Sequence, residues 1–511
     1  MSGPSLETAS ALASRYEAVV IGAGPAGLTA AARLAEGGAS TLLLDENPAP
    51  GGQIYRSIEA AGAGDLRRLG PDYAHGRAVA ERFRASGAAY APRATVWDVG
   101  PATGPVAGGA ADRASTSNRL VSLTLGGAGR AIEAGHVILA TGAIERPMPF
   151  PGWTLPGVMT AGAAQIALKT AGLVPTGRVI VAGCGPLLYL LTSQLLDAGA
   201  EIAAVLDTTP RGNWLRAAPH APGFLASAYM GKGLKLLRTV RTRTRVIGGV
   251  TALATEGTGA LRAVRYGTGS GKGALEADLL LVHQGVVPNA NFSNAIGCAH
   301  HFDEAQRAFV PDLDDWFASS LDGVSIPGDG GGIAGAAAAE VSGEIAALGA
   351  LRRLGRLGEA PAMEAALPLR RRWKSLQRGR AFLDRLYAPS PAFLAPPDDD
   401  TIVCRCEEVR AGAVREAIGL GVAGPNQLKT FLRCGMGPCQ GRFCAGTVTE
   451  MIAAGRGESP AAVGTYRLRA PVKPVRLSEL ASFPETPEAV LAVTGSHSTD
   501  RIEPLSTGDM Q

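Results

Sequence analysis

A glycine-rich turn between an apolar strand and a helix constrains this chain more than any other feature. Ala18–Ile21 predicts a buried strand, residues 22–27 (GAGPAG) a tight turn, and Leu28 to Gly37 a helix. A second strand, from Thr41 to Leu44, ends at Asp45. Strand, turn, helix and terminal acid in this order predict a βαβ unit that binds a dinucleotide.

Each position of the turn has a physical role. Gly22 permits the bend, Gly24 lets a pyrophosphate approach the backbone, and Gly27 lets the helix pack on the strand. Because phosphates sit at such a helix N-terminus, Pro25 and Ala26 join the predicted site. Asp45 and its neighbour Glu46 are candidates to accept hydrogen bonds from ribose hydroxyls.

A second unit of the same kind begins with a strand at Arg178 to Ala182. Its turn contains Gly183, Gly185 and Pro186, and its second strand ends at Asp207. Leucine occupies the third glycine position, at Leu188, where a large side chain crowds the phosphates or pushes the helix away. A bound nucleotide and an empty groove both remain open.

Composition limits the function and the compartment. At 511 residues and 46% hydrophobic content, the chain has room for about three domains, and a net charge of +4 indicates no nucleic-acid partner. No run of 18 apolar residues predicts a transmembrane segment, and residues 1–15 show no leader pattern. We therefore expect a cytoplasmic protein, peripheral to the inner membrane face if it associates with a membrane.

Five of the 7 cysteines cluster near the C-terminus, at Cys404, Cys406, Cys434, Cys439 and Cys444. Crowded thiolates bind soft metals, and a reducing compartment disfavours disulfides. Iron–sulfur is the favoured interpretation, while structural zinc and a disulfide remain alternatives. The other two cysteines, Cys184 and Cys298, lack a CxxC partner, and we interpret them as core residues.

The predicted fold class is α/β, with two nested Rossmann-like domains of the FAD/NAD(P)-binding type and a small α-rich module. Arg370–Arg372 is interpreted as a solvated helix face. The predicted parts are 16–150 with 276–350 (first domain), 151–275 (second domain), 351–400 (basic helix and proline-rich linker), 401–456 (cysteine module) and 457–511 (extended tail). Within the module, helices are predicted from Glu407 to Gly419 and from Gln440 to Ala454.

Several motifs together resemble flavoproteins with two dinucleotide-binding domains. They are residues 20–27, Gly51-Gly52-Gln53, Ala140-Thr141-Gly142, residues 285–289 (GVVPN) and Gly328-Asp329. The resemblance implies FAD in the first domain, with Asp329 near the ribityl or phosphate part. Gly52, Gln53, Thr141, Gly142 and Gly328 complete the implied site.

The pattern is more closely similar to one family: the FAD-containing alpha subunits of opine (octopine and nopaline) oxidases, D-hydroxyproline dehydrogenase and proline dehydrogenase complexes. Hydrogen cyanide synthase B is a relation. Residues 44–56, 183–188 and the CxC and GMGPCQGRFC segments carry the match, over about residues 16–475. It implies a module similar to bacterioferritin-associated ferredoxin, with a [2Fe–2S] cluster on Cys404, Cys406, Cys439 and Cys444. Cys434 is then a fifth thiol near the cluster.

The family resemblance also implies a division of labour. A flavoprotein beta subunit oxidises the C–N bond of an amino or imino acid, and this chain relays electrons between flavin and cluster to a quinone or electron carrier. A small gamma subunit is a further implied partner. Alternatives are a self-contained NAD(P)H-dependent reductase, a non-catalytic scaffold and a glycine-oxidising subunit of the cyanide synthase type.

No histidine lies in a motif that assigns it a catalytic role. The candidates by residue type are His75, His220, His283, His300 and His301. His283, before Gly285, is the one expected nearest a cofactor, although a satisfied strand-end histidine is the better interpretation. The catalytic residues are therefore left unknown.

Overall fold

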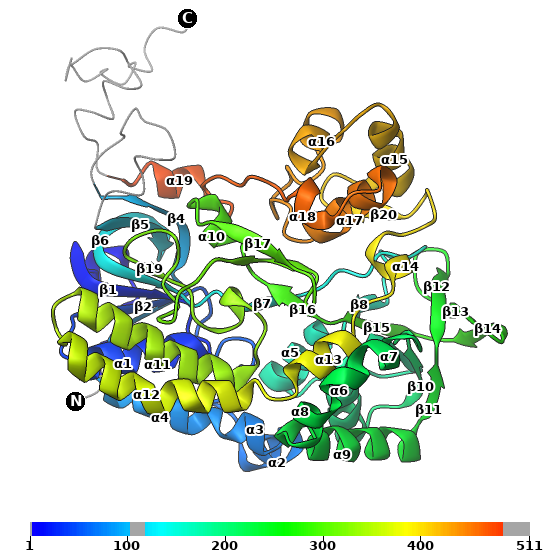
Figure 1. Ribbon diagram of the computed structural model, residues 1–511, viewed down its shortest axis with the longest axis horizontal. Coiled ribbons are helices and arrows are strands. Elements are labelled where there is room, and N and C mark those ends of the chain that lie inside the picture. The colour runs from blue at the N-terminus through cyan, green and yellow to red at the C-terminus, as the bar shows by residue number, and fades with distance from the viewer. Residues whose placement is uncertain (1–2, 103–117, 484–511) are drawn as a thin grey trace, which may run out of the picture.

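The computed structural model describes residues 3–102 and 118–483, which build two β-sheet domains and a small third module (Figure 1). In the first sheet, parallel strands bind one another through backbone hydrogen bonds, and an antiparallel pair extends one side. In spatial order its strands are β3 (Ala89–Pro92), β2 (Thr41–Asp45), β1 (Arg15–Ile21), β6 (Ala128–Leu139), β5 (Arg119–Leu125) and β4 (Thr95–Pro101), and β19 (Val324–Ser325) also pairs with β6.

Small residues allow two helices to pack closely on this sheet. A Cβ added at Gly343 of α11 (Ala336–Arg353) would lie 2.3 Å from the carbonyl oxygen of Ala26 in α1 (Pro25–Glu36). Thr29 Oγ1 of α1 donates to the carbonyl oxygen of Glu340 at 2.9 Å. The smaller helices here are α2 (Ala63–Leu69), α3 (Pro71–Ala74) and α4 (Gly76–Ala85).

The second sheet is entirely parallel, and strands from both sides of its βαβ unit complete it. In spatial order its strands are β11 (Arg245–Gly248), β10 (Ile202–Asp207), β9 (Val179–Cys184), β15 (Leu279–Gln284) and β8 (Val158–Thr160). The second sheet thus reaches Gln284, past the predicted boundary at 275. Around it lie α5 (Ala161–Ala171), α6 (Pro186–Asp197), α7 (Asn213–Ala217), α8 (Ala221–Leu225) and α9 (Ala228–Arg243), with a side sheet of β12 (Val250–Glu256), β13 (Ala263–Thr268) and β14 (Gly271–Glu276).

Short strands join the two domains. β7 (Ala143–Glu145) pairs with β16 (Val286–Pro288), so the segments that leave the two sheets run antiparallel to each other. The short helix α10 (Asn291–Ala295) and the hairpin of β17 (His300–Asp303) and β18 (Ala308–Pro311) follow.

The segment 351–400, predicted as a basic helix and a proline-rich linker, is mostly helical. Arg371 and Arg372 of α12 (Glu359–Leu376) are exposed, whereas Arg370 lies over the Trp316 ring, 4.6 Å from its centroid. α13 (Arg380–Leu386) then packs on the second domain, and α14 (Pro391–Leu394) leads to the module. Within the described ranges, no helix has the length and apolar character needed to cross a bilayer.

The module contains a short hairpin and four helices: β20 (Ile402–Cys404), β21 (Val409–Arg410), α15 (Ala411–Gly419), α16 (Pro425–Leu432), α17 (Ala445–Arg456) and α18 (Pro460–Val463). The two predicted helices begin later than expected, since Glu408 and Gln440 adopt positive φ angles of 52° and 49° that interrupt a helix. α16 has no counterpart among the predicted helices.

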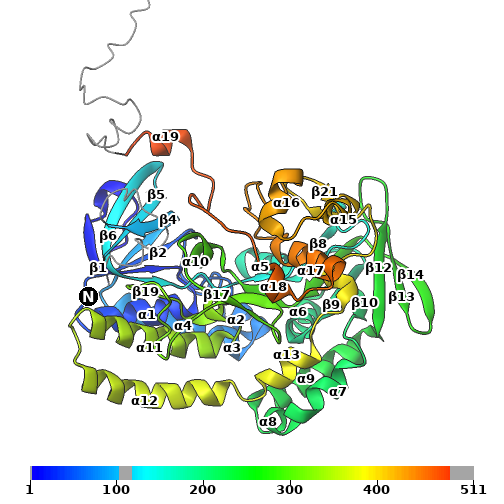
Figure 2. The same ribbon diagram turned by 45° about the horizontal axis from the view of Figure 1, so that its top comes forward.

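After α18 the chain returns to the first sheet (Figure 2). The amide of Val472 donates to the carbonyl oxygen of Trp97 at 2.9 Å, and Phe483, just after α19 (Leu477–Leu480), packs edge-on against the Trp97 ring. The tail therefore wraps the body as far as residue 483. The rest of the predicted tail, 484–511, lies outside the described residues.

Candidate cofactor sites

The predicted FAD motifs converge at one edge of the first sheet. A Cβ added at Gly52 would lie 2.7 Å from Gly24 Cα, and one added at Gly328 would lie 2.8 Å from Ala26 Cβ. A Cβ at Gly330 would lie 3.0 Å from Thr141 Oγ1. Segments far apart in sequence thus share one surface around the glycine turn.

Gly24 distinguishes a ligand site from a merely structural turn. Gly22 and Gly27 are required by the protein, because a Cβ there would lie 2.4 Å from the carbonyl oxygen of Ala140 and 1.8 Å from that of Gly22, respectively. A Cβ at Gly24 would meet only Gly52 Cα, at 4.0 Å, and Gly24 has an ordinary negative φ of −79°. Neither packing nor backbone conformation requires glycine there, which fits a cradle for a pyrophosphate.

Asp45 lies beside this cradle and is almost fully buried. Its Oδ2 accepts from the Ala23 amide at 2.5 Å, and its Oδ1 accepts from the backbone and side chain of Asn47, both at 2.7 Å. Burial raises the pKa of the Asp45 carboxyl group. Since a carboxylate has about four acceptor positions, one remains for a ribose hydroxyl. Glu46, by contrast, pairs with Lys473 of the tail.

Lys169 is a residue that the sequence analysis missed. Its Nζ reaches from α5 of the second domain to the carbonyl oxygens of Gln53, at 3.2 Å, and Ile54, at 2.9 Å. Burial lowers the pKa of Lys169 to about 8. No motif marks this lysine, yet it fixes the GGQ segment against the second domain.

Asp329 stabilises the loop that leads into α11. Its Oδ1 accepts from the amides of Ala334, at 2.8 Å, and Gly335, at 2.9 Å. Among the described residues no donor is recorded for Oδ2. This oxygen is therefore the part of Asp329 left for a ligand.

Asp207, the acid that ends the second strand of the second βαβ unit, already accepts hydrogen bonds from the protein. Tyr189, next to Leu188 on α6, donates its hydroxyl to Asp207 Oδ2 at 2.5 Å, and the Thr209 amide donates to Oδ1 at 2.8 Å. Leu188 is fully buried in the core. Tyr189 therefore contacts the carboxylate that would receive a ribose in a nucleotide-binding unit.

The chain also covers the carboxyl edge of the second sheet. The thiol of Cys184, at the end of β9, donates to the carbonyl oxygen of Tyr387 at 3.4 Å, and Asn213 Nδ2 donates to those of Leu386 and Ala388 at 3.0 and 2.9 Å. Nucleotides bind outside the carboxyl ends of parallel strands. Residues 386–388 occupy part of that region beside Gly183, Gly185 and Pro186.

The clustered cysteines form two groups. The Sγ atoms of Cys404, Cys434 and Cys444, all buried, lie within 4.8 Å of one another. Hydrogen bonds from the Cys434 and Cys444 thiols hold the pKa of Cys404 far below its usual range, and the thiolate is the form that binds metals. Exposed Cys406 lies beside half-buried Cys439. Partial burial of its thiol raises the pKa of Cys406, and the neighbouring Cys439 thiol contributes to the shift.

The ring of Tyr466 packs beside the buried cysteines, in a space that two glycines leave open. The buried Tyr466 hydroxyl lies 3.9 Å from Cys444 Sγ. Gly435 and Gly441 both have positive φ, and a Cβ at either would lie 2.5 Å from the Tyr466 ring. The sequence did not indicate Tyr466, because it lies well beyond the last cysteine.

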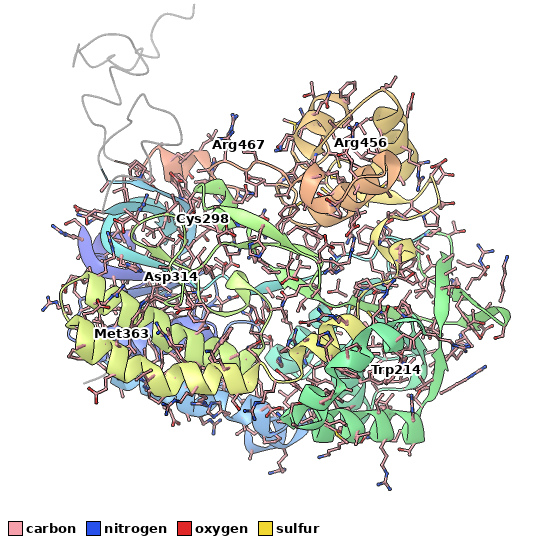
Figure 3. All side chains as sticks on the ribbon, viewed as in Figure 1. Trp214, Cys298, Asp314, Met363, Arg456 and Arg467 are labelled. Carbon is pink, nitrogen blue, oxygen red and sulfur yellow. The ribbon has the colours of Figure 1, made fainter. Side chains whose placement is uncertain are left out.

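Cys298, by contrast, lies in the body near β17, away from the module that carries Arg456 (Figure 3).

The module is fixed to the body by Trp153 and by the loop between two cysteines. Trp153 Nε1 donates to the carbonyl oxygen of Ile402 at 2.8 Å, and the Arg405 guanidinium lies over its ring at 5.4 Å. Asn291 Nδ2 donates to the carbonyl oxygen of Gln440 at 3.2 Å. The cysteine module therefore has a defined position against both domains.

His283 is a satisfied strand-end residue, as expected. Its Nδ1 lies 2.7 Å from Oε1 of Glu145, and the ring is almost completely buried. Among the other candidates, His75 contacts Glu340 at 3.0 Å and His301 pairs with exposed Asp312. These contacts assign no proton-transfer role to the histidines.

Comparison with known proteins identifies both the two-domain body and the cysteine module. Residues 16–343 match the pyridine nucleotide-disulphide oxidoreductase family, and residues 402–454 match the BFD-like [2Fe-2S] binding domain. L-proline dehydrogenase from P. horikoshii has the same fold, with a TM-score of 0.66 at 19% identity over 91% of this chain and 79% of that one. The predicted fold class, FAD and [2Fe–2S] cluster are confirmed.

Full-length relatives give the family. An opine oxidase subunit of Rhizobium meliloti is 51% identical over 508 residues, 99% of this chain and 95% of that protein. The hydrogen cyanide synthase subunit HcnB of Pseudomonas aeruginosa is 31% identical over 90% of this chain and 97% of that protein. The chain is thus an FAD- and [2Fe–2S]-containing oxidoreductase subunit that belongs to the same family as these opine oxidase and cyanide synthase subunits.

Proposed function

We propose that this chain is the electron-relaying alpha subunit of a heteromeric dehydrogenase for opines, D-hydroxyproline, proline or a related amino or imino acid. A flavoprotein beta subunit oxidises the C–N bond, and electrons pass between FAD and cluster here to a quinone or electron carrier. The relatives named as opine oxidase subunits support the substrate class. A cytoplasmic location, peripheral to the inner membrane face if membrane-associated, and a small gamma subunit belong to the same proposal.

One observation carries the relay. The loop Gln440–Phe443, between Cys439 and Cys444, lines a cavity of about 100 Å³ together with Ile144 and Pro288. Ile144 follows the FAD motif Thr141-Gly142, and Pro288 precedes Asn289, which accepts a hydrogen bond from Thr141 Oγ1 at 3.1 Å. Residues adjoining the two proposed cofactor sites therefore line the same cavity. FAD exchanges two electrons and the cluster one at a time, which suits a relay.

The residues proposed to hold the cofactors are those of the convergent motifs. FAD is held by Gly22, Gly24, Pro25, Ala26, Gly27, Asp45, Glu46, Gly52, Gln53, Thr141, Gly142, Gly328 and Asp329. The cluster is held by Cys404, Cys406, Cys439 and Cys444, with Cys434 beside the buried pair. A second nucleotide at Gly183, Gly185, Pro186 and Asp207 is disfavoured by Tyr189 and by residues 386–388.

Purification from the source organism tests the proposal. We expect the chain to co-purify with a second flavoprotein, and the complex, but not the isolated chain, to oxidise an opine, D-hydroxyproline or proline. Glycine, as substrate, would instead indicate cyanide synthesis. Full turnover by the isolated chain, or rapid flavin bleaching by NADH or NADPH, would contradict the division of labour.

A further inference from the structure

The cavity between the body and the cysteine module carries more positive charge than its walls neutralise. Arg146, Arg307 and Arg442 line it, and Glu450 is the one carboxylate among the lining residues. Arg146 follows β7 of the body, Arg442 lies in the loop between two cysteines, and Glu450 is on α17. Cations from both parts of the molecule therefore meet in one half-enclosed space.

Glu450 is already committed to one of the three arginines. Arg307 Nε donates to Glu450 Oε1 at 3.0 Å, and its Nη2 donates to Oε2 at 2.6 Å. This bidentate pair occupies both oxygens of the Glu450 carboxylate, and the Arg307 guanidinium neutralises the carboxylate charge. The charges of Arg146 and Arg442 remain.

Arg146 donates only to neutral acceptors. Its Nη1 and Nη2 donate to the carbonyl oxygens of Arg307, at 3.0 Å, and Gln306, at 2.6 Å. Its Nε is buried and has no hydrogen-bond partner among the described residues. Burial lowers the pKa of Arg146 to about 10, so the side chain is still a cation at neutral pH.

Arg442 lies on the module side of the cavity and shares one feature with Arg146. Its Nε is likewise buried without a partner among the described residues. His300, also on the wall, adds no charge, because burial lowers its pKa and its ring nitrogens contact Ser293 Oγ and the carbonyl oxygen of Cys298. Two guanidinium groups without a carboxylate partner among the described residues thus share the cavity, each with a buried N–H available.

We propose that this cavity binds a small oxyanion, a carboxylate or phosphate group, between Arg146 and Arg442. Buried charges are normally paired, and guanidinium groups match the geometry of both anions. A volume of about 100 Å³ leaves room for a small anion, since roughly 10–15 Å³ of cavity volume measured in this way already holds one water. This proposal does not depend on the electron relay.

Equilibrium dialysis of the cofactor-loaded full chain tests the site. Radiolabelled inorganic phosphate and radiolabelled acetate are dialysed separately, at an ionic strength held constant with potassium chloride. We expect Arg442→Gln to weaken binding about tenfold or more, the loss of one charge-assisted hydrogen bond. We expect Glu450→Gln to strengthen binding, because it removes the carboxylate from the cavity wall and leaves Arg307 with only the Glu304 carboxylate, 3.7 Å from its Nη1.

Arg433→Gln is the matched control. Arg433 lies beside Cys434 in the same module, but it pairs with Glu407 at 3.2 Å and does not line the cavity. Its variant should bind as the wild type does. Tighter binding of phosphate would show that the site takes a phosphate group, and tighter binding of acetate would show that it takes a carboxylate.

Three results would overturn the site: no binding of either anion by the wild type, equal losses in Arg433→Gln and Arg442→Gln, or weaker binding by Glu450→Gln. Melting temperature and visible spectrum check that each variant folds and keeps its cofactors. If Arg442→Gln does not fold, the gain expected of Glu450→Gln decides the test. The flavin-to-cluster relay is measured independently, so its failure and the failure of this site are distinguishable.

Discussion

Trp153 Nε1 donates a hydrogen bond to the carbonyl oxygen of Ile402 at 2.8 Å, and this bond joins the body to the start of the cysteine module. Trp153→Phe keeps an aromatic ring beneath Arg405 but removes the donor. We expect the unfolding free energy to fall by about 1 kcal/mol, as for one buried hydrogen bond. Hydrogen exchange of the amides of residues 402–410 should speed up correspondingly.

Trp97 provides a control for that substitution. Its indole nitrogen is buried without a hydrogen-bond partner among the described residues. Trp97→Phe should therefore leave exchange in the module unchanged. Equal acceleration by both variants would show that the Trp153 hydrogen bond does not fix the module.

Alanine substitutions at Gly24 and Gly27 should have different effects, the first on cofactor binding and the second on folding. A Cβ at Gly24 meets only Gly52 Cα, at 4.0 Å, whereas one at Gly27 would lie 1.8 Å from the Gly22 carbonyl oxygen. We expect Gly24→Ala to keep the melting temperature of the cofactor-free protein but weaken FAD binding at least tenfold. Gly27→Ala should lower that melting temperature. Unchanged FAD affinity in Gly24→Ala, measured by fluorescence titration, would contradict the pyrophosphate cradle.

The occupied second groove predicts that pyridine nucleotides are not electron donors. Tyr189 contacts Asp207, and residues 386–388 cover the strand ends. Stopped-flow mixing of the anaerobic holoprotein with NADH or NADPH should leave the flavin oxidised. Tyr189→Phe frees the Asp207 carboxylate, but residues 386–388 still cover the strand ends. The flavin of this variant should therefore also stay oxidised. Reduction of the wild type within seconds would restore the NAD(P)H-dependent reductase as an interpretation.

The cysteine variants test the cluster ligands one thiol at a time. Cys439→Ser and Cys406→Ser should lose most of the cluster's visible absorption, because a ligand is removed. Cys434→Ser should keep it, although the Cys434 thiol lies in the buried group. Iron content and the visible spectrum check each variant. The reverse pattern, with Cys434 essential and Cys439 dispensable, would replace one member of the proposed set.

Buried His136 makes the fold sensitive to acid. Its Nε2 lies 3.0 Å from Ser325 Oγ, and burial lowers its pKa to about 3. The unfolded chain takes up this proton below about pH 6.5, while the folded chain does so only near pH 3. Stability is therefore lost as pH falls from 6.5 to 3, by up to about 1.4 kcal/mol per unit.

His136→Gln should remove this share of the acid sensitivity. Between pH 7 and pH 5, its unfolding free energy in urea titrations should fall by about 2 kcal/mol less than that of the wild type. Parallel slopes for the variant and the wild type would mean that His136 does not titrate as a buried neutral group.

The glycine and cysteine positions could be predicted from the sequence because each has a local physical requirement. Gly22 and Gly27 have no room for a side chain, and clustered thiols point to a metal. The family resemblance supplied what spacing alone left open, namely iron over zinc. The helix starts in the module were wrong because positive φ at Glu408 and Gln440 leaves no trace in the hydrophobic pattern.

Contacts between distant segments could not be predicted. Lys169 reaches Gln53 across 116 positions, and Asn213 reaches Leu386 across 173. Their residue types fit many surface environments, and no motif specifies which face α13 covers. The occupied second groove and the arginine-lined cavity therefore emerged only when the domains and the module were placed together.

The relay is tested most directly by rapid-freeze electron paramagnetic resonance on the complete complex. An opine, or whichever amino or imino acid it oxidises, is added without oxygen or external acceptor. The account predicts that the signal of the reduced [2Fe–2S] cluster appears within the time of one turnover, and that the isolated chain gives no signal with the same substrate. A cluster that stays oxidised while the flavins are fully reduced would contradict it.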